Sequence, residues 1–216
     1  MPLGPALIII ALMNTESSRH DLRPFFTSLQ SLVVLSESAK IAFTEAVHPK
    51  SFAKSDYLIR AGESDTGLYL IQKGLVRFVY LTEDGKEFNK SFAAEGEFVG
   101  CLLSMLTTHN CRFSIQALEA CDTIFLSNLD RKRLFQRFPE WERLGRILAE
   151  QLALKKEARE AEFLLDSAEI RYQRFMTEHP DWIKRLPQYQ IASYLGITDV
   201  ALSRIRHKPG TATASD

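Results

Sequence analysis

Between residues 51 and 127, short apolar runs alternate with turn-forming residues, and this pattern constrains the fold more than any other feature of the chain. The runs at 57–59, 67–71 and 74–81 are separated by glycines or other turn signals. The last run leads into Asp84-Gly85, a pair in which both residues tolerate the positive φ of a tight hairpin. Many short strands joined in this way are typical of an antiparallel barrel or a double-sheet jelly roll. We therefore predict an N-terminal antiparallel β jelly-roll barrel.

Helical patterns flank this block on both sides. Residues 14–50 place apolar side chains at helical spacing, and Pro49 is expected to close the segment because a proline restricts the residue before it. Beyond Pro139, Gly145 is the only glycine or proline up to residue 165, so we predict a long helix there.

Read in heptads, the long helix has a seam suited to a partner helix. The seam comprises Leu144, Ile147, Gln151, Leu154, Ala158, Ala161 and Leu165. It predicts a dimerisation helix. The alternative is that the helix packs on its own barrel.

The segment from Gln188 to Lys208 has the pattern of a helix-turn-helix, with apolar residues on one face of each of two short helices. Gly196 lies where the turn needs a left-handed residue, and Thr198 suits the N-cap of the second helix. The buried side is expected to comprise Ile191, Ala192, Leu195, Val200 or Ala201, Leu202 and Ile205.

The opposite face of the second helix is polar and is predicted to contact DNA. Arginine can pair with the edge of guanine, and serine or lysine can hold a phosphate. Residues 167–216 carry seven Lys and Arg against five Asp and Glu, so the affinity of one chain for DNA would be modest and binding would need a dimer. A helical hairpin with a solvated charged end is the alternative. The face comprises Asp199, Ser203, Arg204, Arg206, His207 and Lys208.

Composition argues against several other classes of protein. Lys plus Arg equals Asp plus Glu at 27 each, and 45% of the residues are hydrophobic, as in ordinary globular proteins. Three cysteines suit a reducing compartment, and none lies at zinc-site spacing, so no metal is expected. Residues 51–127 contain one histidine, His109, and the chain has no nucleophile–base set or phosphate loop, so we expect no enzyme and no catalytic residue.

The N-terminal apolar run from Ala6 to Met13 is too short to span a bilayer. It has no Lys or Arg ahead of it, so it makes a poor signal peptide. We therefore expect a cytoplasmic protein with no membrane partner. Both Met1 and Met13 are candidate translation starts.

The barrel, long helix and helix-turn-helix, in this order, resemble the Crp/Fnr family of bacterial transcription regulators over about residues 20–208. In the barrel the resemblance rests on the motifs at 62–74, 84–87 and 94–100. It implies an α+β fold with a cyclic-nucleotide-binding-like domain, a dimerisation helix and a small helical DNA-binding domain. The expected boundaries are 14–135 for the sensor domain, 139–165 for the dimerisation helix, 166–208 for the helix-turn-helix domain and 209–216 for a disordered tail.

The resemblance also bears on the DNA contacts. Thr198, Ser203 and Arg204 match positions that contact DNA in relatives, and Gln188 is added to the predicted contacts. Val200 stands where many relatives carry an acidic base-contacting residue, so a different operator is expected. The family's wing is shortened here to residues 181–186, which suggests a trimmed DNA-binding domain.

In the cyclic-nucleotide-binding relatives, a Gly-Glu pair holds the ribose and a later arginine neutralises the cyclic phosphate. Here Gly100-Cys101 matches the pair and Cys111 matches the arginine. Strand alternation sends Arg112 to the face opposite Cys111, unless a bulge near Asn110 reverses it. We therefore expect no ordinary cyclic AMP binding and no cofactor. The residues assigned to a candidate ligand pocket are Glu97, Gly100, Cys101, Cys111 and Arg112.

The sequence thus predicts a homodimeric, DNA-binding transcription regulator with double-stranded DNA as its partner. RNA polymerase and an unidentified small-molecule effector are further candidate partners. The alternative is a sensor module that acts through protein contacts and has degenerate DNA binding. A thiol sensor, metal or cluster site at Cys101 and Cys111 also stays open.

Overall fold

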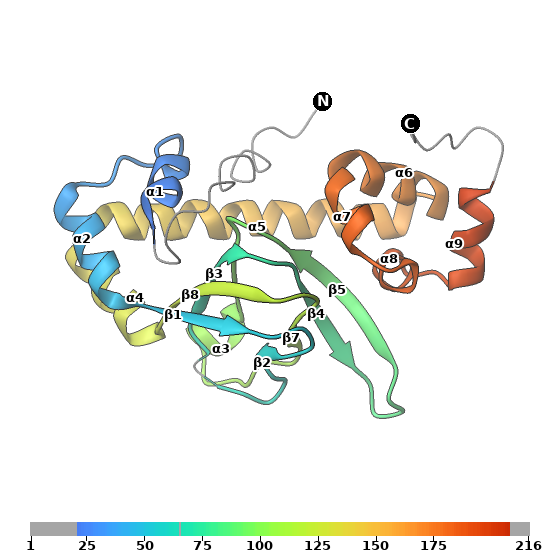
Figure 1. Ribbon diagram of the computed structural model, residues 1–216, viewed down its shortest axis with the longest axis horizontal. Coiled ribbons are helices and arrows are strands. Elements are labelled where there is room, and N and C mark those ends of the chain that lie inside the picture. Colours follow the sequence, from blue (N-terminus) through green and yellow to red (C-terminus); the bar gives the residue numbers. More distant parts are fainter. Residues whose placement is uncertain (1–20, 65, 208–216) are drawn as a thin grey trace. The chain divides into compact units, whose positions relative to one another are not determined.

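The computed structural model describes residues 21–64 and 66–207 (Figure 1). These residues form two compact units. The first unit contains the described residues up to Tyr80 together with Ser91–Leu152, and the second contains Leu81–Lys90 together with the described residues from Ala153 onward. Predicted features at residues 1–20 and 208–216, including the apolar N-terminal run, Lys208 and the C-terminal tail, lie outside the described residues.

The β region of the first unit consists of two four-stranded antiparallel sheets, which form a roll rather than one closed barrel. This confirms the predicted double-sheet fold. One sheet has the order β1 (Val47–Phe52), β8 (Cys121–Leu126), β3 (Leu68–Lys73), β6 (Phe98–Gly100). The other has the order β2 (Tyr57–Ile59), β7 (Ser114–Ala117), β4 (Val76–Leu81), β5 (Glu87–Ala93).

Two apolar cores hold the first unit together. One lies between the sheets and draws residues from both, such as Ile71, Val76 and Ile115, which are fully buried. The other packs helices against the β1–β8–β3–β6 sheet around Phe43 and Trp141. The helices of this unit are α1 (Arg23–Leu29), α2 (Glu37–Ala46), α3 (Leu102–Leu106), α4 (Asn128–Arg137) and the start of α5 (Pro139–Leu165).

The prediction that Pro49 closes a helical segment is wrong. Helix α2 ends at Ala46, and Pro49 lies within β1, where it is opposite Ile124 of β8. Strand β1 is at the edge of its sheet, so a residue without an N–H group can be placed there without breaking the ladder.

The long helix after the roll lies where the sequence predicts one. Helix α5 starts at Pro139, where the missing N–H costs nothing. Ser167 caps the next helix, with its side chain accepting a hydrogen bond from the N–H of Ile170. Of the helices within the described ranges, none has the length and apolar character needed to cross a bilayer. The remaining helices are α6 (Ala168–Glu178), α7 (Pro180–Arg185), α8 (Gln188–Leu195) and α9 (Asp199–Arg206).

Candidate nucleic-acid interface and sensor cassette

Helices α8 and α9 form a helix-turn-helix pair within the second unit (Figure 1). Gly196 ends α8 with a φ of +68°, a left-handed conformation that glycine adopts without strain. A Cβ atom at this position would lie 2.7 Å from the ring of Phe163, so the turn also needs glycine for close packing. Thr198 then caps α9 by accepting a hydrogen bond from the N–H of Ala201 at 3.2 Å.

The two helices bury one face each. Ile191, Ala192 and Leu195 of α8 are buried, as are Leu202 and Ile205 of α9. Of the two residues considered for the remaining apolar position, Ala201 is half-buried and Val200 is 61% exposed. Gln190 is also buried, and no buried amide was predicted on this face.

The outward face of α9 presents most of the predicted DNA contacts to solvent. Asp199, Arg204 and His207 are exposed, as are Thr198 at the cap and Gln188 at the start of α8. Ser203 and Arg206 are half-exposed. The ring Nδ1 of His207 lies 2.7 Å from the carbonyl oxygen of Ser203, and because a carbonyl only accepts, Nδ1 carries the proton and donates it.

Two arginines fix the C-terminal end of α8 by donating to its last carbonyls. Arg159 donates from Nη2 to the oxygen of Tyr194 at 2.5 Å, and Arg171 donates from Nη2 to the oxygen of Leu195 at 3.1 Å. The Arg159 guanidinium also lies over the Tyr194 ring, 3.6 Å from its centroid. Burial lowers the pKa of Arg159 from its usual value, although the group stays charged. These two arginines therefore hold the end of α8, from which the chain turns into α9.

The start of strand β5 also holds α8, and sequence reasoning missed this contact. Residues Leu81–Lys90 belong to the second unit. Asn89 donates from Nδ2 to the carbonyl oxygen of Gln190 at 3.0 Å and to its side-chain Oε1 at 2.5 Å. The backbone N–H of Asn89 donates to Oγ of Ser193 at 3.0 Å. Asn89 and Gln190 are 6% and 3% exposed, so these bonds are shielded from water.

The segment between β6 and β7 is where the sequence predicts a ligand cassette. It contains the short helix α3, with Cys101 before it and Cys111 after it, and both cysteines are buried in the core between the sheets. Arg112 is exposed whereas Cys111 and Phe113 are buried, which agrees with the expected strand alternation. The position that the resemblance assigns to the phosphate-binding arginine is therefore occupied by Cys111, and Arg112 does not replace that arginine.

The other two residues assigned to the pocket have structural tasks. Glu97 accepts a hydrogen bond from the N–H of Ala94 at 2.9 Å and so closes the turn before β6. Gly100 is paired with Leu68 of β3, and a Cβ there would lie 2.8 Å from the oxygen of Gly67. A larger residue at Gly100 would separate the two strands.

A protein-family model described as "Cyclic nucleotide-binding domain" matches residues 49–138. The chain is 26% identical over 176 residues to the cAMP-activated global transcriptional regulator CRP of Salmonella typhimurium, an alignment that covers 76% of this chain and 82% of that protein. The chain is therefore similar to regulators of the Crp/Fnr family over most of its length.

Solved structures of this family share the fold. A Crp/Fnr-family regulator from Eubacterium rectale has a TM-score of 0.65 at 16% identity and covers 84% of this chain and 85% of its own. The c-di-GMP-responsive global regulator CLP of Xanthomonas campestris has a TM-score of 0.64 at 17% identity and covers 82% of this chain and 97% of its own.

The predicted seam of α5 divides into two parts. Leu144 is 2% exposed and packs in the core around Phe43 and Trp141, so the prediction that it faces a partner is wrong. The heptad pattern cannot tell a helix face that meets its own domain from one that meets a second chain. Ile147, Gln151 and Ala158 are half-buried, Ala161 is exposed, and Leu154 and Leu165 are 61% and 82% exposed.

The region expected to be a shortened wing is a helix. Residues 180–185 form α7, which starts at Pro180 and buries Trp182. The Trp182 ring is stacked on His179, with ring centroids 3.8 Å apart and planes 3° apart. The segment therefore contributes to the core of the second unit.

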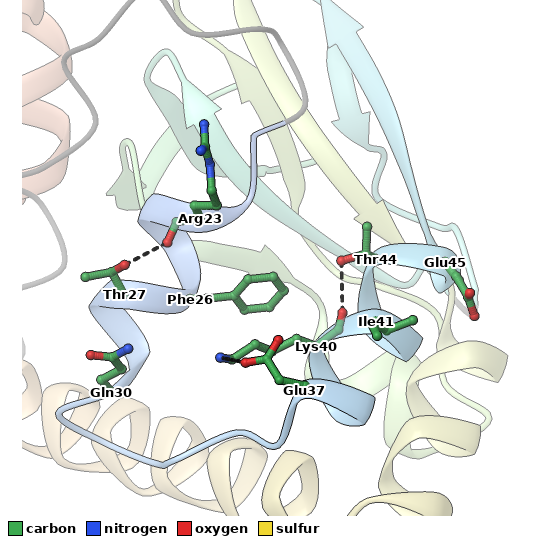
Figure 2. Close-up of a pocket in the computed structure, with 9 residues that line it drawn as sticks. All are labelled: Arg23, Phe26, Thr27, Gln30, Glu37, Lys40, Ile41, Thr44 and Glu45. Atoms are coloured by element: carbon green, nitrogen blue, oxygen red, sulfur yellow. Dashed lines mark hydrogen bonds and ion pairs between the residues drawn. The ribbon is translucent and has the colours of Figure 1, made fainter.

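A surface hollow of about 560 Å³ lies outside the roll, between α1 and α2. Figure 2 shows Phe26 pointing into it from α1 and the paired side chains of Glu37 and Lys40 bordering it from α2. Thr27 and Thr44 donate to carbonyls of their own helices. Because these polar groups are already bonded within α1 and α2, we assign the hollow no ligand.

Proposed function

We propose that this protein is a homodimeric, sequence-specific DNA-binding transcription regulator of the Crp/Fnr type, without catalytic activity. The observation that carries the proposal is the exposed face of α9. Arg204 and His207 lie on that face, while Leu202 and Ile205 anchor the opposite face. An α-helix presented in this way can enter the major groove and bring arginine to the edge of guanine. Such a regulator would act in the bacterial cytoplasm, with RNA polymerase as a candidate partner.

Dimerisation is proposed through the second half of α5. Leu154, Ala158, Ala161 and Leu165 recur at intervals that place them on one face of the helix. The leucines at both ends of this face are exposed in the single chain. A second copy of α5 would cover them and bring two α9 helices together. Two copies would compensate for the small positive surplus of residues 167–216.

We further propose that the roll does not bind cyclic AMP in the usual way. The positions of the family's ribose carboxylate and phosphate arginine are taken by Cys101 and Cys111, which are both buried among apolar side chains. A phosphate buried there without a cation would cost on the order of several kcal/mol. Any small-molecule effector would therefore need chemistry other than that of a cyclic phosphate.

The test is a mobility shift with promoter DNA from the protein's own locus. Arg204→Ala is expected to lose most of the saturable, sequence-specific shift, because it removes a base-reading side chain. The matched control is Arg133→Ala, which removes an exposed arginine of α4 that is paired with Asp130 in the first unit. Equal binding by both variants would contradict the proposal.

A second candidate function is a sensor module that acts through protein contacts. It is favoured by the acidic Asp199 in the first turn of α9 and by the exposed apolar side chain of Val200 beside it. This candidate predicts weak DNA binding that does not depend on sequence and is unaffected by Arg204→Ala. The same mobility-shift series therefore separates the two functions.

A further inference from the structure

One apolar side chain lies on the otherwise polar outward face of α9. Val200 is the second residue of this helix, and its 61% exposure places it in solvent rather than in the core. Arg204 and His207 follow it at intervals of four and three residues, so the three side chains share one face. Leu202 and Ile205 are buried on the opposite face and anchor the helix. Packing within the second unit therefore does not account for the valine.

The place of Val200 along α9 favours a contact with the edge of a base. The helix begins at Asp199 after the Thr198 cap, whose hydroxyl oxygen accepts a hydrogen bond from the N–H of Ala201 at 3.2 Å. Val200 therefore lies in the first turn. A recognition helix directs its N-terminal residues at base edges in the major groove. Arg204 lies one turn later, so an arginine that reaches guanine would bring Val200 to a nearby base pair.

The chemistry of the Val200 side chain restricts the base that it can recognise. The isopropyl group has no hydrogen-bond donor or acceptor, so it cannot distinguish bases by hydrogen bonding. Of the four bases, only thymine presents an apolar group in the major groove, its C5-methyl group. The χ1 angle of a valine in a helix is nearly fixed, so the isopropyl group has little rotamer entropy to lose on binding. A rigid apolar surface in the first turn therefore fits a thymine methyl group.

We propose that Val200 selects a thymine in each half of the DNA site by covering its C5-methyl group. This inference rests on the proposed DNA-binding function and specifies part of the sequence that is recognised. Covering one methyl group should raise the affinity about fourfold per half-site. One helical turn rises about 5.4 Å and one base-pair step about 3.4 Å, so the thymine should lie about one or two base pairs from the guanine read by Arg204.

The experiment first selects, from a random-sequence pool, the duplexes that bind the native full-length protein. Each thymine of the selected site is then replaced in turn by deoxyuridine, which keeps the O4 acceptor and the pairing with adenine but lacks the methyl group. Fluorescence anisotropy measures the affinity for each duplex. At one thymine per half-site the replacement should weaken binding by the wild type about fourfold, and replacement in both half-sites should weaken it about 16-fold.

Val200→Ser removes both methyl groups of the side chain and should bind the thymine and uracil duplexes equally. Val200→Thr keeps one methyl group and should retain part of the preference. The matched control is Val34→Ser, which changes an 83% exposed valine between α1 and α2 in the first unit and should behave like the wild type.

Two results would overturn this inference alone. One is a selected site in which no thymine can be replaced by uracil with a loss of wild-type affinity. The other is a preference for thymine that Val200→Ser retains in full. A pool in which the wild type enriches no sequence would overturn the proposed function as well.

Discussion

The two units of the molecule are held together by different kinds of interaction. The first unit has two continuous apolar cores, in which Phe43, Ile71 and Ile115 are fully buried. The second unit buries fewer large apolar side chains and relies on hydrogen-bonded polar groups, among them the half-buried Arg159 and Arg171 and the buried Asn89–Gln190 pair. The Nε atom of Arg171 is buried with no hydrogen-bond partner among the described residues. We therefore expect cavities to destabilise the first unit most, and loss of polar partners to destabilise the second unit most.

The chain contains two tryptophans, and one lies in each unit. Trp141 donates to the carbonyl oxygen of Ala39 in the first unit, and Trp182 is stacked on His179 in the second. Trp182→Phe therefore leaves a fluorescence reporter of the first unit, and Trp141→Phe leaves a reporter of the second. The unfolding of each unit can therefore be followed separately by tryptophan fluorescence in one of these two backgrounds.

The largest effect is expected from Phe43→Ala in the first unit. Phe43 is 1% exposed, and its ring is stacked on Trp141 with centroids 4.6 Å apart. The truncation should cost about 3–5 kcal/mol of unfolding free energy, because the cavity adds to the lost apolar transfer. Urea unfolding in the Trp182→Phe background should record this loss. A loss below about 1 kcal/mol would mean that this core is not close-packed.

Gly196→Ala should lower the unfolding free energy of the second unit by about 2–3 kcal/mol. The new methyl group would clash with the Phe163 ring, and the positive φ would add backbone strain. Gly85→Ala is the matched control. Gly85 has a φ of +81°, but a Cβ there meets nothing within 4 Å, so about 1–2 kcal/mol of backbone strain is expected. Urea midpoints in the Trp141→Phe background measure both. Equal losses would show that packing against Phe163 does not matter.

Asn89→Ala should lower the unfolding free energy of the second unit by about 1–3 kcal/mol. The substitution removes the two hydrogen bonds that the Asn89 amide donates to the buried Gln190. Asn110→Ala removes an exposed amide from a loop of the first unit and should change little. Amide hydrogen exchange along α8 should accelerate in the first variant alone. Unchanged exchange would show that the Asn89 hydrogen bonds do not stabilise α8.

Acid should weaken the second unit through His179. Burial, followed by the charge of Lys155, lowers the pKa of His179 to about 4. Because the folded pKa is below the unfolded value, the unfolded chain binds a proton first as the pH falls. Stability contributed by neutral His179 is therefore complete above about pH 6.5 and is lost between about pH 6.5 and pH 4, by at most about 1.4 kcal/mol per pH unit.

His179→Phe keeps an aromatic ring beside Trp182 and removes the titrating group. Its urea midpoint, followed by Trp182 fluorescence, should vary less with pH in this window than that of the wild type. An identical pH profile would assign the acid sensitivity to other groups.

The local parts of the fold could be predicted from the sequence, and the long-range parts could not. The helix-turn-helix depends on signals within a few residues of each other, such as Gly196 and the Thr198 cap, so its pattern is visible in the chain. The Asp84-Gly85 hairpin is equally local. Asn89 contacts Gln190 across about a hundred residues of sequence, and no local pattern in either segment predicts this contact.

Pro49 and Leu144 show why other predictions were wrong. A proline can end a helix or occupy an edge strand, and only the sheet order, with β1 outermost, decides between them. The apolar character of Leu144 predicts burial but not the partner that buries it, which is its own core.

In the proposed function, two copies of the chain place their α9 helices on one DNA duplex. Sedimentation of the protein with its promoter fragment tests this most directly, with wild type compared with Leu154→Glu, which puts a charge on the exposed α5 face in the second unit. We expect two chains per duplex for the wild type and loss of both dimer and complex for the variant. One chain per duplex, or a variant that binds like the wild type, would contradict it.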